Sequence, residues 1–238
     1  MKPLFTILFT SFLIVSCTKH DNATILKDKN ISGEKHNNSD HECPVDSVAM
    51  QTSEYKGITF YTENNLRGSG VITLSVTGKT DILNNDKTTY GSIALNNDEE
   101  MSYEIKLQKK TVVREIIADS EFRIFNFDAE KPDTDKDFLI VYINREKKLI
   151  SKKDNQFTFD PWDKYAQSAF VKLTPEVSNT TKDEQLYWYK ALVVKGDSMK
   201  IKSISKTDCD YVEHYKPVTK WIKWRTDSCK LINFNFCY

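Results

Sequence analysis

The sequence predicts a mainly β protein, in which an antiparallel β-sandwich or barrel region is followed, after one short linking helix, by a second and smaller β region. Three observations support this prediction. From Cys43 onward, short runs alternate apolar with polar residues and are rich in aromatic and β-branched side chains. Turn sequences such as Asn64-Asn65 and Lys131-Pro132-Asp133 separate these runs. Many short strands at such spacing are typical of an antiparallel sandwich or barrel.

The first β region is expected over residues 43–160. In its clearest strand, Met101, Tyr103, Ile105 and Leu107 alternate strictly with polar residues. Residues 138–143 form an almost continuous apolar run, which predicts a strand buried on both faces. The expected strands are 57–62, 71–77 (with Ile72, Leu74 and Val76 on one face), 101–108, 111–117, 121–127 and 138–143.

One helix is expected, and it links the two β regions. Asp160 suits the N-cap position and Pro161 suits the first helical position. The residues after them fall on one side at helical spacing: Trp162, Tyr165, Ala166 and Ala169.

The second β region is expected over residues 161–238. Lys195-Gly196-Asp197 predicts a hairpin turn, and in the strand after it Met199 and Ile201 face one way while Lys200 and Lys202 face the other. The expected strands are 169–173, 186–194, 199–204, 219–225 and 230–236.

This C-terminal part resembles a bacterial SH3-like barrel. The residues that carry the resemblance are Leu192–Asp197, Met199–Ile201 and Trp221–Arg225. In that family, a hairpin of this kind precedes a strand with a Trp-Ile or Trp-Val pair, and such domains bind peptides or cell-wall components through an aromatic groove. The resemblance implies that such a groove would be lined by Tyr187, Tyr189, Trp221 and Trp224. Alternatively, these side chains are the core and rim of a small barrel.

The N-terminus reads as a secretion signal over residues 1–16. Lys2 precedes an apolar run, residues 4–15, which is shorter than the ~20 residues that a membrane span needs. The run ends at Ile14-Val15-Ser16-Cys17, which resembles the lipobox of bacterial lipoproteins. The resemblance implies that the chain is cleaved before Cys17 and that Cys17 is acylated, so the protein should incorporate labelled palmitate. It places the chain in the bacterial envelope, anchored to a membrane by lipid. Because Thr18 rather than an aspartate follows Cys17, the outer membrane is the expected location.

Residues 17–42 are expected to be a flexible tether, because this polar stretch has too few apolar residues to form a core. Over the whole chain, 34 basic residues balance 34 acidic ones. Removal of residues 1–16 takes away one lysine and no acid, which leaves a net charge of about −1. This charge and the location argue against nucleic acid as a partner.

The sequence offers only weak support for three chemistries. Gly196-Asp197-Ser198 resembles the nucleophile block of GDSL-type hydrolases, but a strand follows Ser198 where those enzymes have a helix. Asp133, Asp135 and Asp137 alternate as calcium ligands do, yet the loop lacks the turn glycine, so a solvated hairpin tip is favoured. His20, His36 and His41 are irregularly spaced in the tether. No catalytic residue, metal ligand or cofactor is therefore predicted.

Four cysteines remain once Cys17 carries lipid, and an oxidising compartment favours two disulfides. A strand over residues 230–236 would hold Cys229 and Cys237 roughly 26 Å apart, too far for a bridge. Two pairings survive. We prefer Cys209–Cys229 with Cys43–Cys237, and the alternative is Cys209–Cys237 with Cys43–Cys229.

The function predicted from these features is non-catalytic binding at the membrane, with a peptide, peptidoglycan or an envelope protein as partner. The alternative is an immunity or inhibitor lipoprotein that neutralises a secreted toxin. That protein would use acidic surfaces, for which Glu99-Glu100 and residues 128–137 are candidates.

Overall fold

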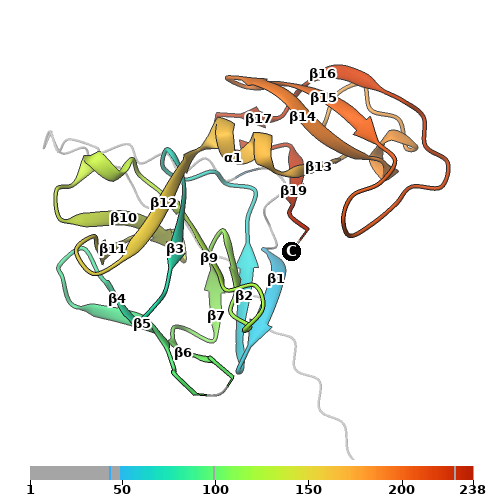
Figure 1. Cartoon of the computed structure of the whole chain (residues 1–238). Coiled ribbons are helices and arrows are strands. Elements are labelled where there is room, and N and C mark those ends of the chain that lie inside the picture. Colours follow the sequence, from blue (N-terminus) through green and yellow to red (C-terminus); the bar gives the residue numbers. More distant parts are fainter. Residues whose placement is uncertain (1–42, 44–48, 99, 228, 238) are drawn as a thin grey trace, which may run out of the picture. The chain divides into compact units, whose positions relative to one another are not determined.

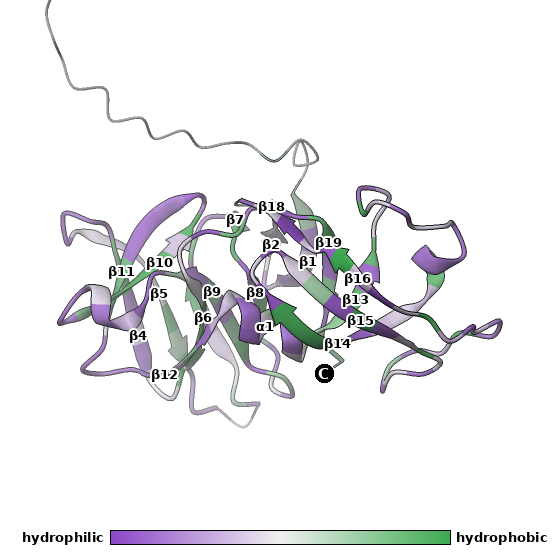
Figure 2. Cartoon of the chain, turned by 90° about the horizontal axis from the view of Figure 1, so that it is seen from above, coloured by the Kyte–Doolittle hydropathy of each residue, from purple (hydrophilic) through white to green (hydrophobic). Residues whose placement is uncertain are grey.

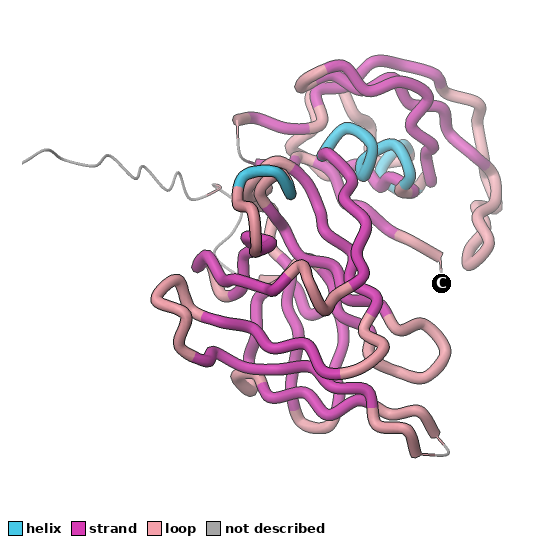
Figure 3. Tube along the Cα trace, turned by 60° about the vertical axis from the view of Figure 1, so that its left-hand side comes forward, coloured by secondary structure: helices cyan, strands magenta, loops and turns pink. Residues whose placement is uncertain are grey.

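The computed structural model describes residues 43, 49–98, 100–227 and 229–237, all within one compact unit, Asp40–Tyr238 (Figure 1). As predicted, this part of the chain is mainly β, and one short helix interrupts the strands (Figure 3). The strands pair antiparallel, apart from a parallel pairing of β2 with β7. In the described residues, no helix combines the length and apolarity needed to cross a membrane.

The first β region holds two sheets. A three-stranded sheet has the order β1-β2-β7, and a nine-stranded sheet has the order β12-β3-β9-β10-β11-β4-β5-β6, with β8 added to β9. The elements are β1 (Met50–Tyr55), β2 (Ile58–Thr62), β3 (Gly70–Ser75), β4 (Lys79–Leu83), β5 (Thr89–Leu95), β6 (Tyr103–Lys106), β7 (Lys110–Val112), β8 (Glu115–Ile117), β9 (Ile124–Ala129), the 3-10 turn η1 (Pro132–Thr134), β10 (Phe138–Ile143), β11 (Glu146–Ser151) and β12 (Gln156–Pro161).

Strand β3 contributes to both cores of the molecule. Ile72, Leu74 and Val76 are buried, as expected, and pack in the first core. Val71 is also buried, but it packs in the second core with Trp162 and Tyr165. The two β regions are therefore joined through apolar packing as well as through the chain.

Strand β10 corrects one prediction, because it is not buried on both faces. Leu139, Val141 and Ile143 are fully buried, whereas the residues that alternate with them are partly exposed. The ammonium of Lys87 lies 5.4 Å from the Phe138 ring centroid, and that of Lys147 lies 5.8 Å from the Tyr142 ring centroid. This face of β10 is thus covered by amphipathic lysine side chains rather than by a second layer.

The helix α1 (Trp162–Ser168) also begins later than predicted. Asp160 and Pro161 still belong to β12, where they pair with Val71 and Gly70. Asp160 makes no N-cap hydrogen bond, and its carboxylate instead pairs with Lys164 at 2.6 Å. A Cβ at Gly70 would lie 2.2 Å from the Asp160 carbonyl oxygen, so a glycine is needed for β12 to approach β3 this closely.

The second β region is a five-stranded antiparallel sheet with the order β16-β15-β14-β13-β19, accompanied by the short β17–β18 hairpin (Figure 1). Its core contains Val171, Tyr189, Met199, Ile201 and Trp224. The elements are β13 (Phe170–Leu173), the 3-10 turn η2 (Glu184–Leu186), β14 (Trp188–Lys195), β15 (Ser198–Ile204), β16 (Thr219–Lys223), β17 (Arg225–Thr226), β18 (Cys229–Lys230) and β19 (Ile232–Asn235).

The disulfides follow the alternative pairing, so the preferred one is wrong. Cys43 bonds to Cys229 and Cys209 bonds to Cys237. The reason is the position of β18. The Lys230 amide donates to the Asn64 carbonyl at 2.9 Å, and Cys229 forms a β-bridge with Asn65. Cys229 is thereby held against the first β region, next to Cys43.

The two bridges differ in exposure, which leads to a prediction about their reduction. Cys43 and Cys229 are 4% and 7% exposed, whereas Cys209 is exposed. Since thiol–disulfide exchange needs access to a sulfur atom, we expect mild reductant to open Cys209–Cys237 first while the fold persists. Alkylation followed by peptide mapping measures this order. A Cys43–Cys237 peptide, or earlier loss of Cys43–Cys229, would contradict the structure.

Candidate functional site

The four aromatic residues predicted to line a groove do not come together in one. Tyr187, Tyr189 and Trp224 are 4%, 0% and 0% exposed and belong to the second core. The Trp224 indole donates to the Gly196 carbonyl at 2.8 Å. Trp221 is 50% exposed and lies on the opposite face of the sheet, because it pairs with Lys200 while the neighbouring Ile222 pairs with the buried Met199.

Ser198 lies where a turn residue would lie. It is exposed, opens β15, and pairs with Lys195 and Lys223 in neighbouring strands. Residues 198–204 form a strand, as predicted, rather than the helix that follows a hydrolase nucleophile.

The acidic loop after β9 uses its oxygen atoms internally. The Asp135 carboxylate accepts hydrogen bonds from the amides of Asp137 and Phe138 at 2.8 and 2.9 Å. The Lys152 ammonium donates to the carbonyls of Pro132 and Asp135, so a cation from the chain itself lies among them. The described residues contain no group of three His, Cys, Asp or Glu side chains arranged to hold a metal ion.

A groove in the second β region is the best-formed candidate for a binding site. Its volume is about 480 Å³, which is within the usual range for ligand sites. We call it the acidic groove. It is lined by Asp183, Leu186, Tyr187, Asp210, Tyr211, Val212, Glu213, His214 and Lys216.

One wall of the acidic groove is η2, and Glu184 fixes it in place. The Glu184 carboxylate accepts from the Lys220 ammonium at 2.7 Å and from the Thr181 amide at 2.8 Å. Its backbone carbonyl accepts the buried Tyr189 hydroxyl at 3.1 Å. Burial alone would raise the pKa of Glu184, but the hydrogen bonds from Lys220 and Thr181 lower it overall. The carboxylate therefore stays ionised and η2 stays attached to the sheet at neutral pH.

The other wall is the segment between β15 and β16. The Trp188 indole donates to the Asp210 carboxylate at 2.7 Å, and the Tyr187 hydroxyl donates to the His214 carbonyl at 3.3 Å. The Cys209–Cys237 bridge ties this segment to the end of the chain. The hydrogen bond from Trp188, aided by the Tyr211 amide, lowers the pKa of Asp210, so Asp210 carries its charge into mild acid.

The lining favours a partner that is both apolar and positively charged. Leu186 and Tyr211 are each 65% exposed, which is unusual for side chains of this size. The lining contains three carboxylates (Asp183, Asp210 and Glu213) and one ammonium (Lys216), so the acidic side chains outnumber the lysine by two. Such a rim attracts lysine, arginine or amine groups.

Sequence reasoning missed this groove, because residues 205–218 lack strand or helix periodicity and read as a connection. The one available signal was composition. Tyr211, His214 and Tyr215 lie among acidic residues next to Cys209, and a long connection with aromatic side chains is a common place for a binding site.

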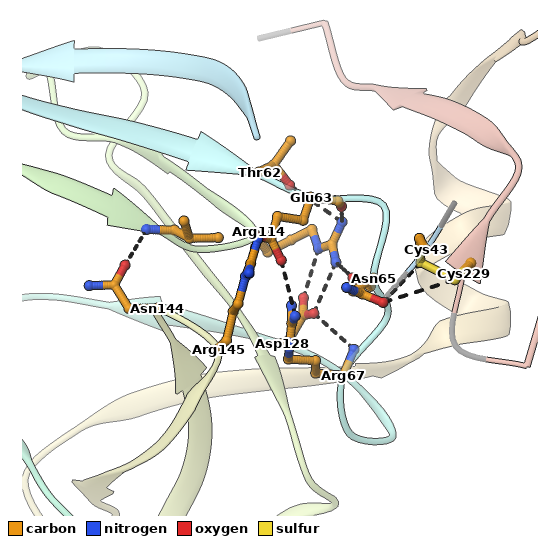
Figure 4. Close-up of polar contacts among 11 residues, drawn as sticks. Cys43, Thr62, Glu63, Asn65, Arg67, Arg114, Asp128, Asn144, Arg145 and Cys229 are labelled. Carbon is orange, nitrogen blue, oxygen red and sulfur yellow. Dashed lines mark hydrogen bonds and ion pairs between the residues drawn. A yellow bond between two sulfur atoms is a disulfide. The ribbon is translucent and has the colours of Figure 1, made fainter. Parts of the chain in front are cut away.

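A cluster of buried charges lies in the first β region and positions the loop before β3 (Figure 4). Arg114 and Asp128 form a two-pronged ion pair, with distances of 2.7 Å from Nε to Oδ1 and 2.9 Å from Nη2 to Oδ2. Arg114 also donates to the carbonyls of Glu63 and Asn65 at 3.2 and 2.7 Å. The Arg67 amide donates to Asp128 at 3.0 Å. Apart from the pair itself, these hydrogen bonds go to backbone atoms of residues 63–67, which indicates that the pair has a structural role.

Glu63 completes this buried ion cluster, although its own carboxylate is less fully bonded. Oε1 accepts from Arg145, with Nη2 at 2.6 Å and Nε at 2.7 Å. Oε2 lies 3.0 Å from Arg67 Nη2, but the angle does not make a hydrogen bond. A cavity of about 10 Å³ beside it has room for one water molecule and no larger ligand.

These contacts leave fewer free carboxylates in residues 128–137, one of the two acidic surfaces predicted for an inhibitor. Asp128 is 4% exposed and paired with Arg114, so no toxin can reach its carboxylate. Glu130 pairs with Lys147 at 3.0 Å and accepts from the Tyr142 hydroxyl at 2.7 Å. Glu99 lies outside the described residues, as do Cys17 and the three histidines of the expected tether.

Comparisons of the chain with protein-family models, with curated protein sequences and with solved structures gave no match. No function can therefore be transferred from a relative to the acidic groove.

The structural role of Arg114 gives a second prediction. Replacing Arg114 with Met leaves Asp128 buried and unpaired, and we expect the free energy of unfolding to fall by about 3–5 kcal/mol. The matched control is Lys79→Met, which breaks an exposed pair with Asp81 and should cost at most about 1 kcal/mol. Urea unfolding measures both. Equal losses would show that the buried pair is not the stronger constraint, and Arg114→Met with Asp128→Leu should recover part of the loss.

Proposed function

We propose that this protein is a lipid-anchored bacterial envelope protein that binds a partner without catalysis, and that the acidic groove is its binding site. The single observation that carries the binding role is the groove itself, a cavity of about 480 Å³ with exposed apolar side chains and an acidic rim. The proposed partner is a positively charged segment of an envelope protein or of a cell-wall peptide.

The physical case for binding is that the groove is held open before any partner arrives. Glu184 and Lys220 fix one wall, and the Trp188–Asp210 hydrogen bond and the Cys209–Cys237 bridge fix the other. Preformed walls reduce the entropy lost when a ligand binds. Leu186 and Tyr211 supply apolar area, and a tyrosine does so with little loss of side-chain freedom.

The envelope location is supported by the lipobox-like sequence that ends at Cys17. Each buried methylene of an acyl chain contributes about 0.8 kcal/mol, and two or three chains would make the anchor effectively permanent. The polar tether between Cys17 and Cys43 would let the compact unit reach partners away from the membrane surface.

Lipidation is tested by Cys17→Ser. We expect the wild-type chain to incorporate radiolabelled palmitate in its host and the variant to incorporate none, because the other cysteines are paired in disulfides. Undiminished labelling of Cys17→Ser would refute the anchor.

Binding at the acidic groove is tested by site-specific photo-cross-linking in the host. A photoreactive phenylalanine analogue replaces Tyr211 in one strain and Leu186 in another, and the control carries it at the exposed Lys109 of the first β region. We expect the two groove positions to give the same adduct, the control to lack it, and Asp183→Asn with Glu213→Gln to weaken it. If the groove positions give no adduct, or share theirs with Lys109, the acidic groove is not the binding site.

A further inference from the structure

The five-stranded sheet has one face in the core and one face toward solvent, and the residues on the solvent side are unusual. Residues paired directly across antiparallel strands point to the same face. The rows of Ile222, Met199 and Val194 and of Ser203 and Tyr189 belong to the buried face. The opposite rows are Thr219–Lys202–Lys190–Phe170, Trp221–Lys200–Val193 and Lys223–Ser198–Lys195.

These rows put a concentration of positive charge on one surface, which we call the lysine face. The rows contain five lysines: Lys190, Lys195, Lys200, Lys202 and Lys223. Lys172 is the sixth, because it follows Phe170 by two residues in β13 and so points to the same face. None of the five strands contains an aspartate or glutamate. The seventh lysine of these strands, Lys220, points to the other side and pairs with Glu184. Figure 2 shows strands β13 to β16 side by side.

Apolar side chains are exposed among these lysines. Trp221 is 50% exposed and pairs directly with Lys200. Leu192, at the bulge in β14, is 43% exposed. The Lys190 ammonium lies 5.5 Å from the ring centroid of Phe170, which is itself partly exposed.

We propose that the lysine face docks on a membrane surface that carries anionic headgroups. Lysines near such a surface are attracted to it, and tryptophan is favoured at the headgroup level. Trp221 and Leu192 could enter the boundary between headgroups and acyl chains, for which a soluble polyanion offers no counterpart. The six lysines, Trp221 and Leu192 do not line the acidic groove, and the contact does not use the lipid on Cys17, so this proposal can be tested independently of the proposed function.

The test is vesicle sedimentation of residues 17–238 carrying Cys17→Ser, which lack both the apolar signal sequence and the lipid. We expect binding to vesicles in which about a third of the lipid is phosphatidylglycerol, little binding to phosphatidylcholine alone, and weakening by salt. Lys200→Glu, Lys202→Glu and Lys223→Glu together should weaken binding at least tenfold, because each lysine contributes about fivefold. The control is Lys109→Glu, Lys136→Glu and Lys153→Glu, which changes the net charge equally at exposed positions of the first β region and should bind almost as wild type.

A second readout does not depend on the charge variants. Trp162, Trp188 and Trp224 are buried, whereas Trp221 is half exposed, so a blue shift of tryptophan fluorescence on anionic vesicles reports on Trp221. The shift should vanish in Trp221→Ala, and circular dichroism checks that each variant is folded. Equal binding of the two triple variants, an unchanged shift in Trp221→Ala, or binding to soluble polyphosphate without binding to vesicles would overturn the proposal.

Discussion

The buried pair of Arg114 and Asp128 is the constraint on which the junction of the two β regions depends. Burying two charges is costly and is tolerated only when geometry and hydrogen bonding are nearly complete. Here the remaining donors of Arg114 and the second oxygen of Asp128 bind the backbone of residues 63–67. That loop then meets Lys230 and Cys229 of the second region, and the Arg114 guanidinium lies 5.1 Å from the Trp162 ring centroid at the start of α1. One ion pair thus fixes the loop, the helix start and the Cys43–Cys229 bridge together.

The acidic groove belongs to the second β region rather than to this junction. Tyr187, Tyr189 and Trp188 are buried parts of the sheet, yet their polar atoms reach outward to His214, Glu184 and Asp210. Two of these three, Tyr187 and Tyr189, are among the four residues that the SH3-like resemblance assigned to ligand contact, and only Tyr187 lines the groove. The hydrogen bonds of Tyr187, Trp188 and Tyr189 hold the walls of the groove. Leu186 and Tyr211, which come from irregular segments, are the exposed apolar side chains presented to a partner.

Local sequence patterns predicted the mainly β architecture. They could not predict features that depend on contacts between residues far apart in the sequence. The alternation over residues 103–107 reflects which side of a strand is buried, so β6, β10 and β15 could be found from the sequence. The prediction was wrong for Met101, which is 40% exposed and lies before β6 in a backbone conformation with positive φ. Strand β4, with the sequence Lys-Thr-Asp-Ile-Leu, offers only two apolar residues and is recruited by pairing with β5 and β11. The disulfide pairing and the partner of Arg114 depend on which loops meet in space, and spacing along the chain carries no such information.

Net charge likewise could not predict the charge of individual surfaces, because it sums charges that the fold places on different surfaces. A chain with 34 basic and 34 acidic residues gives no reason to expect attraction to anionic lipid. The five strands nevertheless place six lysines on one face and contain no aspartate or glutamate, while three carboxylates line the groove. The two surfaces meet near Trp188, which belongs to the lysine face and donates to Asp210 of the groove. On the proposed anionic membrane, the lysines would be attracted and the groove carboxylates repelled. The same sheet would then turn the acidic groove away from the lipid and toward its partner.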